Sequence, residues 1–264
     1  MVLLWLFLRF FERRNLYYPE RVLDATPADA RLPFEDVTFV AEDDCPLHGW
    51  WIPHQEARGT IIMCHGNAGN ISSRIWMAAD LYQLGVNVFL FDYRGYGKSR
   101  GIPSERGLAR DARAAFEMVR ARYKDSEEPP VIVYGRSLGG AVAVQLALDK
   151  PVRGLILESA LASTIEIGKE LYPLLPVSLF CRDRYDMISK IKDVTVPLVI
   201  AHSPHDTLIP YKLGQKVFEN AHEPKVFHDL HGDHNDSGWN FDGPYWHSIE
   251  ELADQVFGPR KNTL

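Results

Sequence analysis

The segment VIVYGRSLGGAVAVQLAL at 131–148 constrains the fold of this chain more than any other. It begins with an apolar run typical of a strand that is buried on both faces, and an apolar stretch of helical length follows. Gly135 and Gly139 lie two residues before and two after Ser137 in the turn between them. A serine on such a tight turn has strained dihedral angles, and small residues on both sides let the two backbones approach. The pattern predicts a strand, a sharp turn that exposes a serine, and a helix.

The rest of the chain alternates short β-rich runs with longer stretches of helical periodicity. We expect strands at 36–41, 47–53, 60–65, 87–93, 131–135, 155–159, 197–203 and 225–230. We expect helices at 71–84, 104–123, 138–149, 211–221 and 246–257. This order predicts an α/β fold with a mostly parallel sheet and helices on both faces, because right-handed crossovers place them there. Only a short connection separates the first two strands, so we expect them to be antiparallel.

The alternation predicts a single domain over residues 19–264, because no repeat, low-complexity segment or linker divides it. Residues 160–193 break the pattern after the sixth expected strand, and they contain Pro173 and Pro176. An insertion at this point lies near the carboxyl ends of the strands, where open α/β sheets bind ligands. We interpret it as a small cap; an ordinary crossover helix packed on the sheet is the alternative.

Residues 1–18 form a separate segment in our interpretation. The run VLLWLFLRFF at 2–11 is apolar except for Arg9, and Arg13 and Arg14 follow it. Ten helical residues rise about 15 Å, half of a hydrocarbon core of roughly 30 Å. We therefore expect a helix that lies in a membrane surface and anchors an otherwise cytoplasmic protein. A helix that covers the domain's own apolar surface and a truncated transmembrane segment are the alternatives, whereas a signal peptide would need a basic start and a small-residue cleavage site.

Charge and cysteine content exclude two classes of protein. The 264 residues include 29 Lys+Arg and 35 Asp+Glu, a formal net charge of −6, and the chain has no long basic run. We therefore expect no nucleic-acid partner, since such binding typically needs clustered Lys and Arg. Cys45, Cys64 and Cys181 are widely spaced and form no CxxC pair, which indicates free thiols rather than a disulfide scaffold or a cysteine zinc site.

Two later residues complete a candidate catalytic set with Ser137. A serine hydroxyl is a poor nucleophile without a base, and the base needs a carboxylate that holds its tautomer. In folds of this topology the chain order is Ser, acid, His. Asp206 follows the seventh expected strand in AHSPHDTLIP, and His234 follows the eighth in HGDHND. We predict that Ser137, His234 and Asp206 are nucleophile, base and acid.

Other histidines and aspartates compete for these roles. His231 precedes the glycine that we expect to form the turn, and His228 lies within the strand run, so we favour His234. Asp183 and Asp186, after the sixth expected strand, are the alternatives to Asp206. The spacing of His228, His231 and His234 does not bring them onto one face in a strand-and-loop setting, so we predict no metal site.

The loop HGNAGN at 65–70 follows the third expected strand, where the second donor of an oxyanion hole should lie. Its glycines let the backbone bend toward a substrate oxygen. We predict that the amides of Asn67 and Leu138 form the oxyanion hole. A plain turn is the alternative for this loop.

These motifs resemble those of the serine α/β-hydrolases, and within them the Bem46-like group that includes ABHD13-type proteins. The matching features are HGNAGN (65–70), YRGYGKSRGIPSERGL (93–108), GRSLGGA (135–141), PLLPVSLFCRDRYD (173–186), HDTLIP (205–210) and HGDHND (231–236). They cover most of residues 35–257. The resemblance implies an eight-stranded hydrolase sheet, the triad Ser137, Asp206 and His234, and no cofactor. It also fits an N-terminal hydrophobic anchor, although the run here is short and carries Arg9.

We expect a serine hydrolase that cleaves carboxylic esters of short or medium acyl chains through an acyl-enzyme. Apolar side chains of the cap offer an acyl site: Leu171, Leu174, Leu175, Val177, Leu179 and Phe180. Cleavage of thioesters, as in acyl-protein thioesterases, or of lipids at a membrane surface uses the same machinery and is the first alternative. A peptidase is less favoured, because the sequence shows no acidic pocket for a peptide amine. A non-catalytic binding module on the same fold is the alternative from another class.

Overall fold

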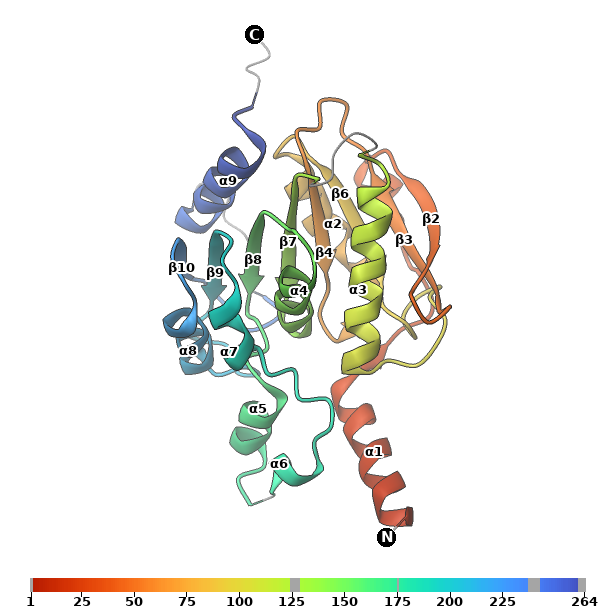
Figure 1. Ribbon diagram of the computed structural model, residues 1–264, viewed down its shortest axis with the longest axis vertical. Helices are drawn as coiled ribbons and strands as arrows, with labels where there is room; N and C mark the ends of the chain where they lie inside the picture. The colour runs from red at the N-terminus through yellow and green to blue at the C-terminus, as the bar shows by residue number, and fades with distance from the viewer. Residues whose placement is uncertain (1, 124–128, 175, 237–242, 261–264) are drawn as a thin grey trace.

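The core of the molecule is one eight-stranded sheet (Figure 1). The computed structural model describes residues 2–123, 129–174, 176–236 and 243–260, and the side chains of residues 2–8 lie outside this description. In spatial order the strands are β10 (Lys225–Asp229), β9 (Leu198–His202), β8 (Gly154–Glu158), β7 (Val131–Arg136), β4 (Thr60–Cys64), β6 (Asn87–Asp92), β3 (Pro46–Ile52) and β2 (Glu35–Val40). The β2–β3 and β3–β6 pairs are antiparallel and the other pairs are parallel. The predicted mostly parallel sheet with an antiparallel start is confirmed.

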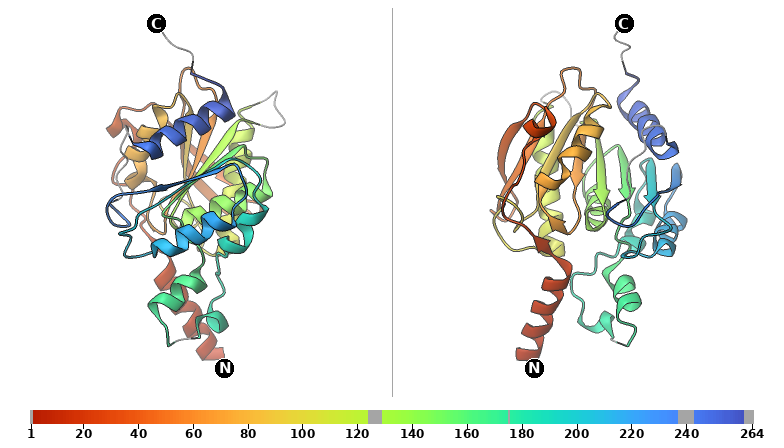
Figure 2. Two further views of the ribbon diagram at one scale, coloured as in Figure 1. Left: turned by 90° about the vertical axis from the view of Figure 1, so that its left-hand side faces the viewer. Right: turned by 180° about the vertical axis from the view of Figure 1, so that it is seen from behind.

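The central strands are apolar because both of their faces are covered. Every residue of β4, β8 and β9 is buried, as expected of strands between two helical layers. One layer contains α3 (Glu105–Arg120), α4 (Leu138–Asp149) and α8 (Tyr211–Asn220), and the other contains α2 (Ile75–Tyr82) and α9 (Pro244–Phe257). Figure 2 shows the two layers from the side and from behind. The helix expected at 71–84 begins as a 3₁₀ turn over Ile71–Arg74 before α2.

Two segments project beyond the carboxyl ends of the parallel strands (Figure 1). One is α1 (Val2–Leu16), and the other is the start of the 160–193 insertion, with α5 (Thr164–Leu171) and α6 (Val177–Phe180). The insertion then returns to the sheet through α7 (Met187–Lys190), whose Met187 is fully buried. Residues 160–193 therefore contain both a projecting part and a part that packs on the sheet. Within the described ranges, none of the helices combines the length and the apolar character that crossing a bilayer requires.

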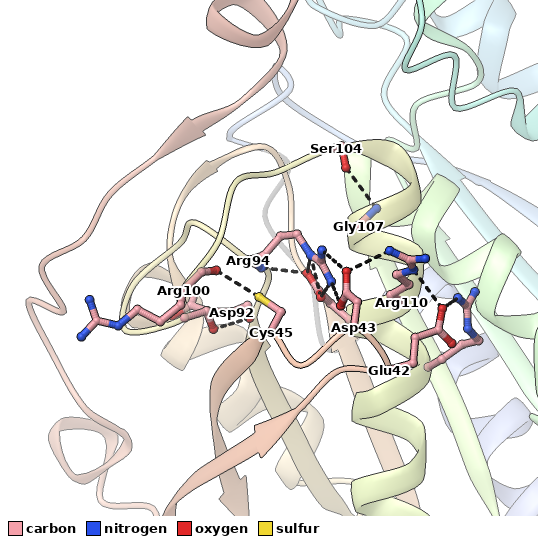
Figure 3. Close-up of polar contacts among 12 residues, drawn as sticks. Glu42, Asp43, Cys45, Asp92, Arg94, Arg100, Ser104, Gly107 and Arg110 are labelled. Atoms are coloured by element: carbon pink, nitrogen blue, oxygen red, sulfur yellow. Dashed lines mark hydrogen bonds and ion pairs between the residues drawn. The ribbon is translucent and has the colours of Figure 1, made fainter.

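A buried arginine fastens the β2–β3 hairpin to α3 (Figure 3). The Arg94 guanidinium donates to Asp43 in the hairpin turn at 2.9 Å and to the fully buried Asp111 of α3 at 2.7 Å. Gly107 lies where a Cβ atom would come within 2.5 Å of the Arg94 side chain, so the glycine makes room for it. This network holds the antiparallel part of the sheet, in which β3 pairs with β6, and β4 separates β6 from β7, the strand that leads to Ser137.

Candidate active site

Ser137 occupies the turn between β7 and α4. Its backbone has φ 52° and ψ −122°, which is a strained conformation for a residue with a side chain. A Cβ atom on Gly135 would lie 2.6 Å from the Gly139 carbonyl oxygen, and one on Gly139 would lie 1.9 Å from the Cys64 carbonyl oxygen. These contacts explain the two glycines, because strand β4, β7 and helix α4 meet too closely for larger residues.

The three residues predicted as nucleophile, base and acid lie in one hydrogen-bonded chain. The His234 Nε2 atom lies 3.1 Å from Ser137 Oγ, and His234 Nδ1 lies 2.7 Å from Asp206 Oδ2. All three residues are at most 8% exposed. Asp206 follows β9 and His234 follows β10, so loops from three parallel strands converge at the carboxyl edge of the sheet. In this arrangement the imidazole can accept the serine proton while the carboxylate holds its other nitrogen.

Asp206 is held in its ionised form. Burial by itself would raise the pKa of Asp206, but hydrogen bonds from His202, His234 and the Ile209 amide outweigh burial and hold this pKa well below its usual range. The Leu208 and Ile209 amides donate to Asp206 Oδ1 at 2.9 and 2.7 Å. An ionised carboxylate favours the His234 tautomer that carries its proton on Nδ1 and leaves Nε2 free to accept one. The contact with His202, whose Nε2 lies 3.3 Å from Asp206 Oδ2, was not expected from the sequence.

The competing residues are engaged elsewhere. His228 contacts Ser248 at 2.9 Å, and His231 is exposed. Asp183 accepts a hydrogen bond from Tyr17, and Asp186 caps α7 by accepting from the Ser189 amide at 3.2 Å. In the part of the chain that the structure describes, His, Cys, Asp and Glu side chains form no group of three that could hold a metal ion. The three cysteines are free thiols.

The loop that follows β4 lies against Ser137. A Cβ atom on Gly66 would lie 3.4 Å from Ser137 Cβ, and Asn67, Ser137 and Leu138 line the same cavity. The Asn67 carbonyl accepts from the Tyr18 amide at 2.9 Å and from the Tyr96 hydroxyl at 2.8 Å. These two hydrogen bonds fix the peptide plane between Asn67 and Ala68.

A two-stranded parallel sheet, which the sequence analysis missed, contributes to this fastening. It pairs β1 (Tyr18–Pro19) with β5 (Ala68–Gly69). The segment that follows α1 is therefore attached to the loop that contains Asn67. Strands of two residues lack the alternating pattern that would have indicated them.

A cavity of about 320 Å³ opens over Ser137. Its walls are mostly apolar, and the cap and α1 both contribute to them: the lining includes Phe11, Leu16, Ile167, Leu171, Val177 and Phe180. The expected acyl site is partly wrong. Leu174 is 94% exposed and Leu179 is 77% exposed, and neither lines the cavity. Leu175 lies outside the described residues.

The carboxylate of Glu12 joins α1 to the cap. Glu12 Oε1 accepts from the Arg182 amide at 2.8 Å and from the Asp183 amide at 2.7 Å. Arg9 pairs with Glu12, and the Tyr17 hydroxyl donates to Asp183 Oδ2 at 3.1 Å. The C-terminal half of α1 is therefore a wall of the cavity. Sequence periodicity could not show this, because the partners lie about 170 residues away.

Comparisons with known proteins show the family to which the chain belongs. A family model described as serine aminopeptidase, S33, matches residues 55–180. The Arabidopsis thaliana alpha/beta hydrolase domain-containing protein WAV2 is 33% identical over 223 residues, which are 76% of this chain and 72% of that protein. The chain belongs to the α/β-hydrolase superfamily.

Two further proteins are similar to this α/β-hydrolase. The uncharacterized protein Rv2307c of Mycobacterium tuberculosis is 37% identical over 228 residues, which are 85% of this chain and 81% of that protein. The solved structure of the Pyrococcus furiosus esterase Pf2001 has a TM-score of 0.75 at 22% identity and covers 91% of this chain and 100% of that one. At that identity the likeness to the esterase is one of fold.

Proposed function

We propose that this α/β-hydrolase is a serine esterase that cleaves carboxylic esters of short or medium acyl chains. One observation carries the proposal: Ser137 Oγ lies at the base of an apolar cavity and 3.1 Å from His234 Nε2, whose Nδ1 contacts Asp206. Such a chain can generate a nucleophile beside a site that accepts an acyl group.

The proposed reaction has two steps. His234 accepts the Ser137 proton as Oγ attacks the ester carbonyl, and the amides of Leu138 and Asn67 stabilise the resulting oxyanion. The intermediate collapses to an acyl-enzyme as His234 returns the proton to the leaving alcohol. Water, activated by His234, then attacks the acyl-enzyme and releases the carboxylic acid and free Ser137.

The cavity favours esters over peptides. Its volume of about 320 Å³ is at the lower end of ligand pockets, roughly 300–1,000 Å³, which suits a short or medium acyl chain. Glu12 is the acidic residue among the lining residues, but its carboxylate already accepts from two main-chain amides and pairs with Arg9. It therefore has little capacity left to bind the free amine of an aminopeptidase substrate.

A fluorophosphonate probe and a series of p-nitrophenyl esters test the proposal. We expect the probe to label wild-type protein but not Ser137→Ala, and hydrolysis to peak between the acetate and the octanoate esters. If folded wild-type protein is not labelled, a non-catalytic binding module is the correct interpretation. A thioester series of the same acyl chains distinguishes an esterase from a thioesterase.

A second candidate is a thioesterase or lipid hydrolase at a membrane surface. The observation in its favour is that large apolar side chains are exposed on the elements that wall the cavity: Phe10 on α1 is 62% exposed, and Leu174 and Leu179 in the cap are more exposed still. The exposed Arg13 and Arg14 on α1 can reach anionic headgroups. On this proposal the protein is membrane-associated through residues 2–11 and otherwise cytoplasmic.

Co-sedimentation with anionic liposomes tests this candidate. Deleting residues 1–14 would also remove Phe11 and Glu12 from the cavity wall, so substitution is the sharper experiment. We expect Phe10→Ser/Leu174→Ser/Leu179→Ser to sediment less than wild type and to hydrolyse p-nitrophenyl acetate equally well. Unchanged sedimentation of the triple variant would exclude these side chains as the membrane contact. Val40 on β2 is also exposed, so Val40→Ser is a matched control and should sediment like wild type.

A further inference from the structure

Arg136 lies directly before the nucleophile and contacts the loop of the catalytic base. It is the last residue of β7, and its Nη2 atom donates to the main-chain carbonyl of His234 at 2.8 Å. Its side chain is 12% exposed. No feature of the ester-cleaving reaction described above uses this side chain.

A fully buried carboxylate holds the other side of the guanidinium. Arg136 Nε lies 3.1 Å from Oε1 of Glu158, which is the residue opposite Arg136 on the neighbouring strand β8. The Glu158 carbonyl also accepts from the Ser137 amide at 3.0 Å. Glu158 therefore contacts both the Arg136 side chain and the main chain of the turn at Ser137.

Two tyrosines also contact Glu158. The hydroxyls of Tyr134 and Tyr245 donate to Glu158 Oε2 at 2.9 and 3.2 Å. Burial, together with the nearby carboxylate, raises the pKa of both tyrosines, so both hydroxyls remain donors. Tyr245 belongs to α9, which begins after the loop that contains His234. The network therefore contacts that loop at His234 and also holds the helix into which the loop leads.

Stability alone does not account for such a pair. The cost of removing two charges from water often cancels their attraction, so a buried ion pair contributes little net stability. The His234 ring, in contrast, must meet two distances at once, one to Ser137 and one to Asp206. Its position depends on its main chain, and misplacement by about 1 Å can cost on the order of 10²-fold in rate.

We propose that Arg136 is a positioning residue that fixes the His234 main chain relative to Ser137, and that Glu158 orients Arg136 for this role. The inference rests on the proposed function, since it assigns a purpose to the position of His234. The hydrogen bond from Arg136 holds the carbonyl group of His234. On the other side Asp233 accepts from the His234 and Thr207 amides and links the loop to the acid loop.

Kinetics of Arg136→Met test the proposal. We expect kcat for p-nitrophenyl butyrate to fall on the order of 10- to 100-fold, with KM changed by less than about twofold. The rate of fluorophosphonate labelling should fall in parallel, because that reaction also needs His234 as base. Glu158→Gln should lower kcat in the same direction, and the double variant should be no slower than Arg136→Met alone.

The matched control is Arg113→Met. Arg113, on α3, also bridges two carboxylates, Glu42 and Asp149, but Asp149 is the last residue of α4, at the end remote from Ser137. We expect its kcat to equal that of wild type. A folded Arg136→Met variant with wild-type kcat, a change confined to KM, or an equal loss in Arg113→Met would overturn the proposal.

Two further measurements separate a failure of this inference from a failure of the proposed function. Should Arg136→Met not fold, Glu158→Gln carries the test alone, because glutamine still accepts from the tyrosines but lacks the charge that pairs with Arg136. An unchanged kcat in that variant then contradicts the inference. If His234→Ala retains wild-type activity, the proposed function itself fails, whatever Arg136 does.

Discussion

The molecule has two halves that meet at Ser137 and are built differently. Ser137, Asp206 and His234 lie on short loops at the edge of the sheet and are buried. Most of the cavity wall comes from α1 and from the segment around α5 and α6, which project from the sheet (Figure 1). Helix α6 has no buried residue, and in α5 only Gly168 is buried. The candidate catalytic residues thus belong to the part with the continuous core, and most of the cavity wall belongs to the part with little apolar burial.

Because the two halves differ in this way, we expect substitutions in each half to change different measured quantities. Segments with few buried contacts open locally at low free energy, whereas core strands open only with the whole protein. Changes in the sheet-borne half should alter kcat or the free energy of unfolding for every substrate. Changes in the projecting half should alter the preference among acyl chains and leave both quantities nearly intact.

Asp206→Asn should have the largest effect. An asparagine would hold the wrong tautomer of His234, so we expect kcat to fall on the order of 10⁴-fold for all chain lengths alike. The measurement is hydrolysis of p-nitrophenyl acetate and octanoate by protein whose circular dichroism matches wild type. Asp186→Asn, which changes the N-terminal capping residue of α7, should retain wild-type kcat. An equal loss of kcat in Asp186→Asn would contradict the assignment of Asp206 as the acid.

Arg94→Met should have the next largest effect, on stability. It leaves Asp111 buried without its counter-charge, which typically costs about 3–5 kcal/mol. Urea unfolding should show this loss, while kcat at low urea stays that of wild type. Arg113→Met breaks partly exposed ion pairs and should cost less than about 1 kcal/mol. A lower kcat in folded Arg94→Met protein would show that the Arg94 network also influences the candidate active site, and would contradict this prediction.

Ile167→Trp tests the projecting half. Ile167 lines the cavity from α5, and a larger ring there should exclude longer acyl chains. We expect the ratio of kcat/KM for octanoate to that for acetate to fall about tenfold or more, because the loss of even one methylene contact costs roughly 1–3 kcal/mol. Leu179→Trp, at a side chain that points away from the cavity, should leave the ratio unchanged. A uniform loss for both esters would contradict the division between the halves.

Asp43→Asn should have the smallest effect, and this effect depends on pH. The hydrogen bond from the Arg94 guanidinium, with Arg110 nearby, lowers the pKa of Asp43 to about 2 from its usual 3.8. Because the folded pKa is the lower one, the ionised carboxylate stabilises the fold above pH 3.8 and loses that contribution as the pH falls toward 2. Partial exposure limits the contribution to about 1 kcal/mol.

The measurement for Asp43 is the free energy of unfolding of wild type and Asp43→Asn at several pH values. The difference between the two proteins should be largest near neutral pH and should narrow below about pH 4. A difference that stays constant from pH 7 to pH 3 would show that the charge of Asp43 does not contribute.

The sequence predicted the parts of this protein whose signals are local. Buried parallel strands are apolar along their whole length, so β4, β7, β8 and β9 could be located to within a residue or two. The helix after Ser137 begins and ends where expected, because the glycine turn and the apolar run are contiguous. The chain order of Ser137, Asp206 and His234 placed all three on loops at one edge of the sheet, where the structure brings their side chains into contact.

Contacts between distant segments needed the tertiary structure. Glu12 meets the amides of Arg182 and Asp183, and Tyr18 pairs with Ala68, through elements too short or too far apart in the chain to leave a pattern. The outward direction of Leu174 and Leu179 depends on how the cap turns, which composition does not specify.

The sequence by itself thus determined the sheet, the sharp turn at Ser137 and the loops that bear the candidate catalytic residues. Hydrophobic periodicity and the conformational freedom of glycine depend on only a few neighbouring residues, so they can be recognised in the sequence. Only the tertiary structure decided that α1 is a wall of the cavity over Ser137, and that Arg136 contacts both Glu158 and the main chain of His234. A buried ion pair and a docked helix depend on which surfaces meet after folding, and no short stretch of sequence contains that information.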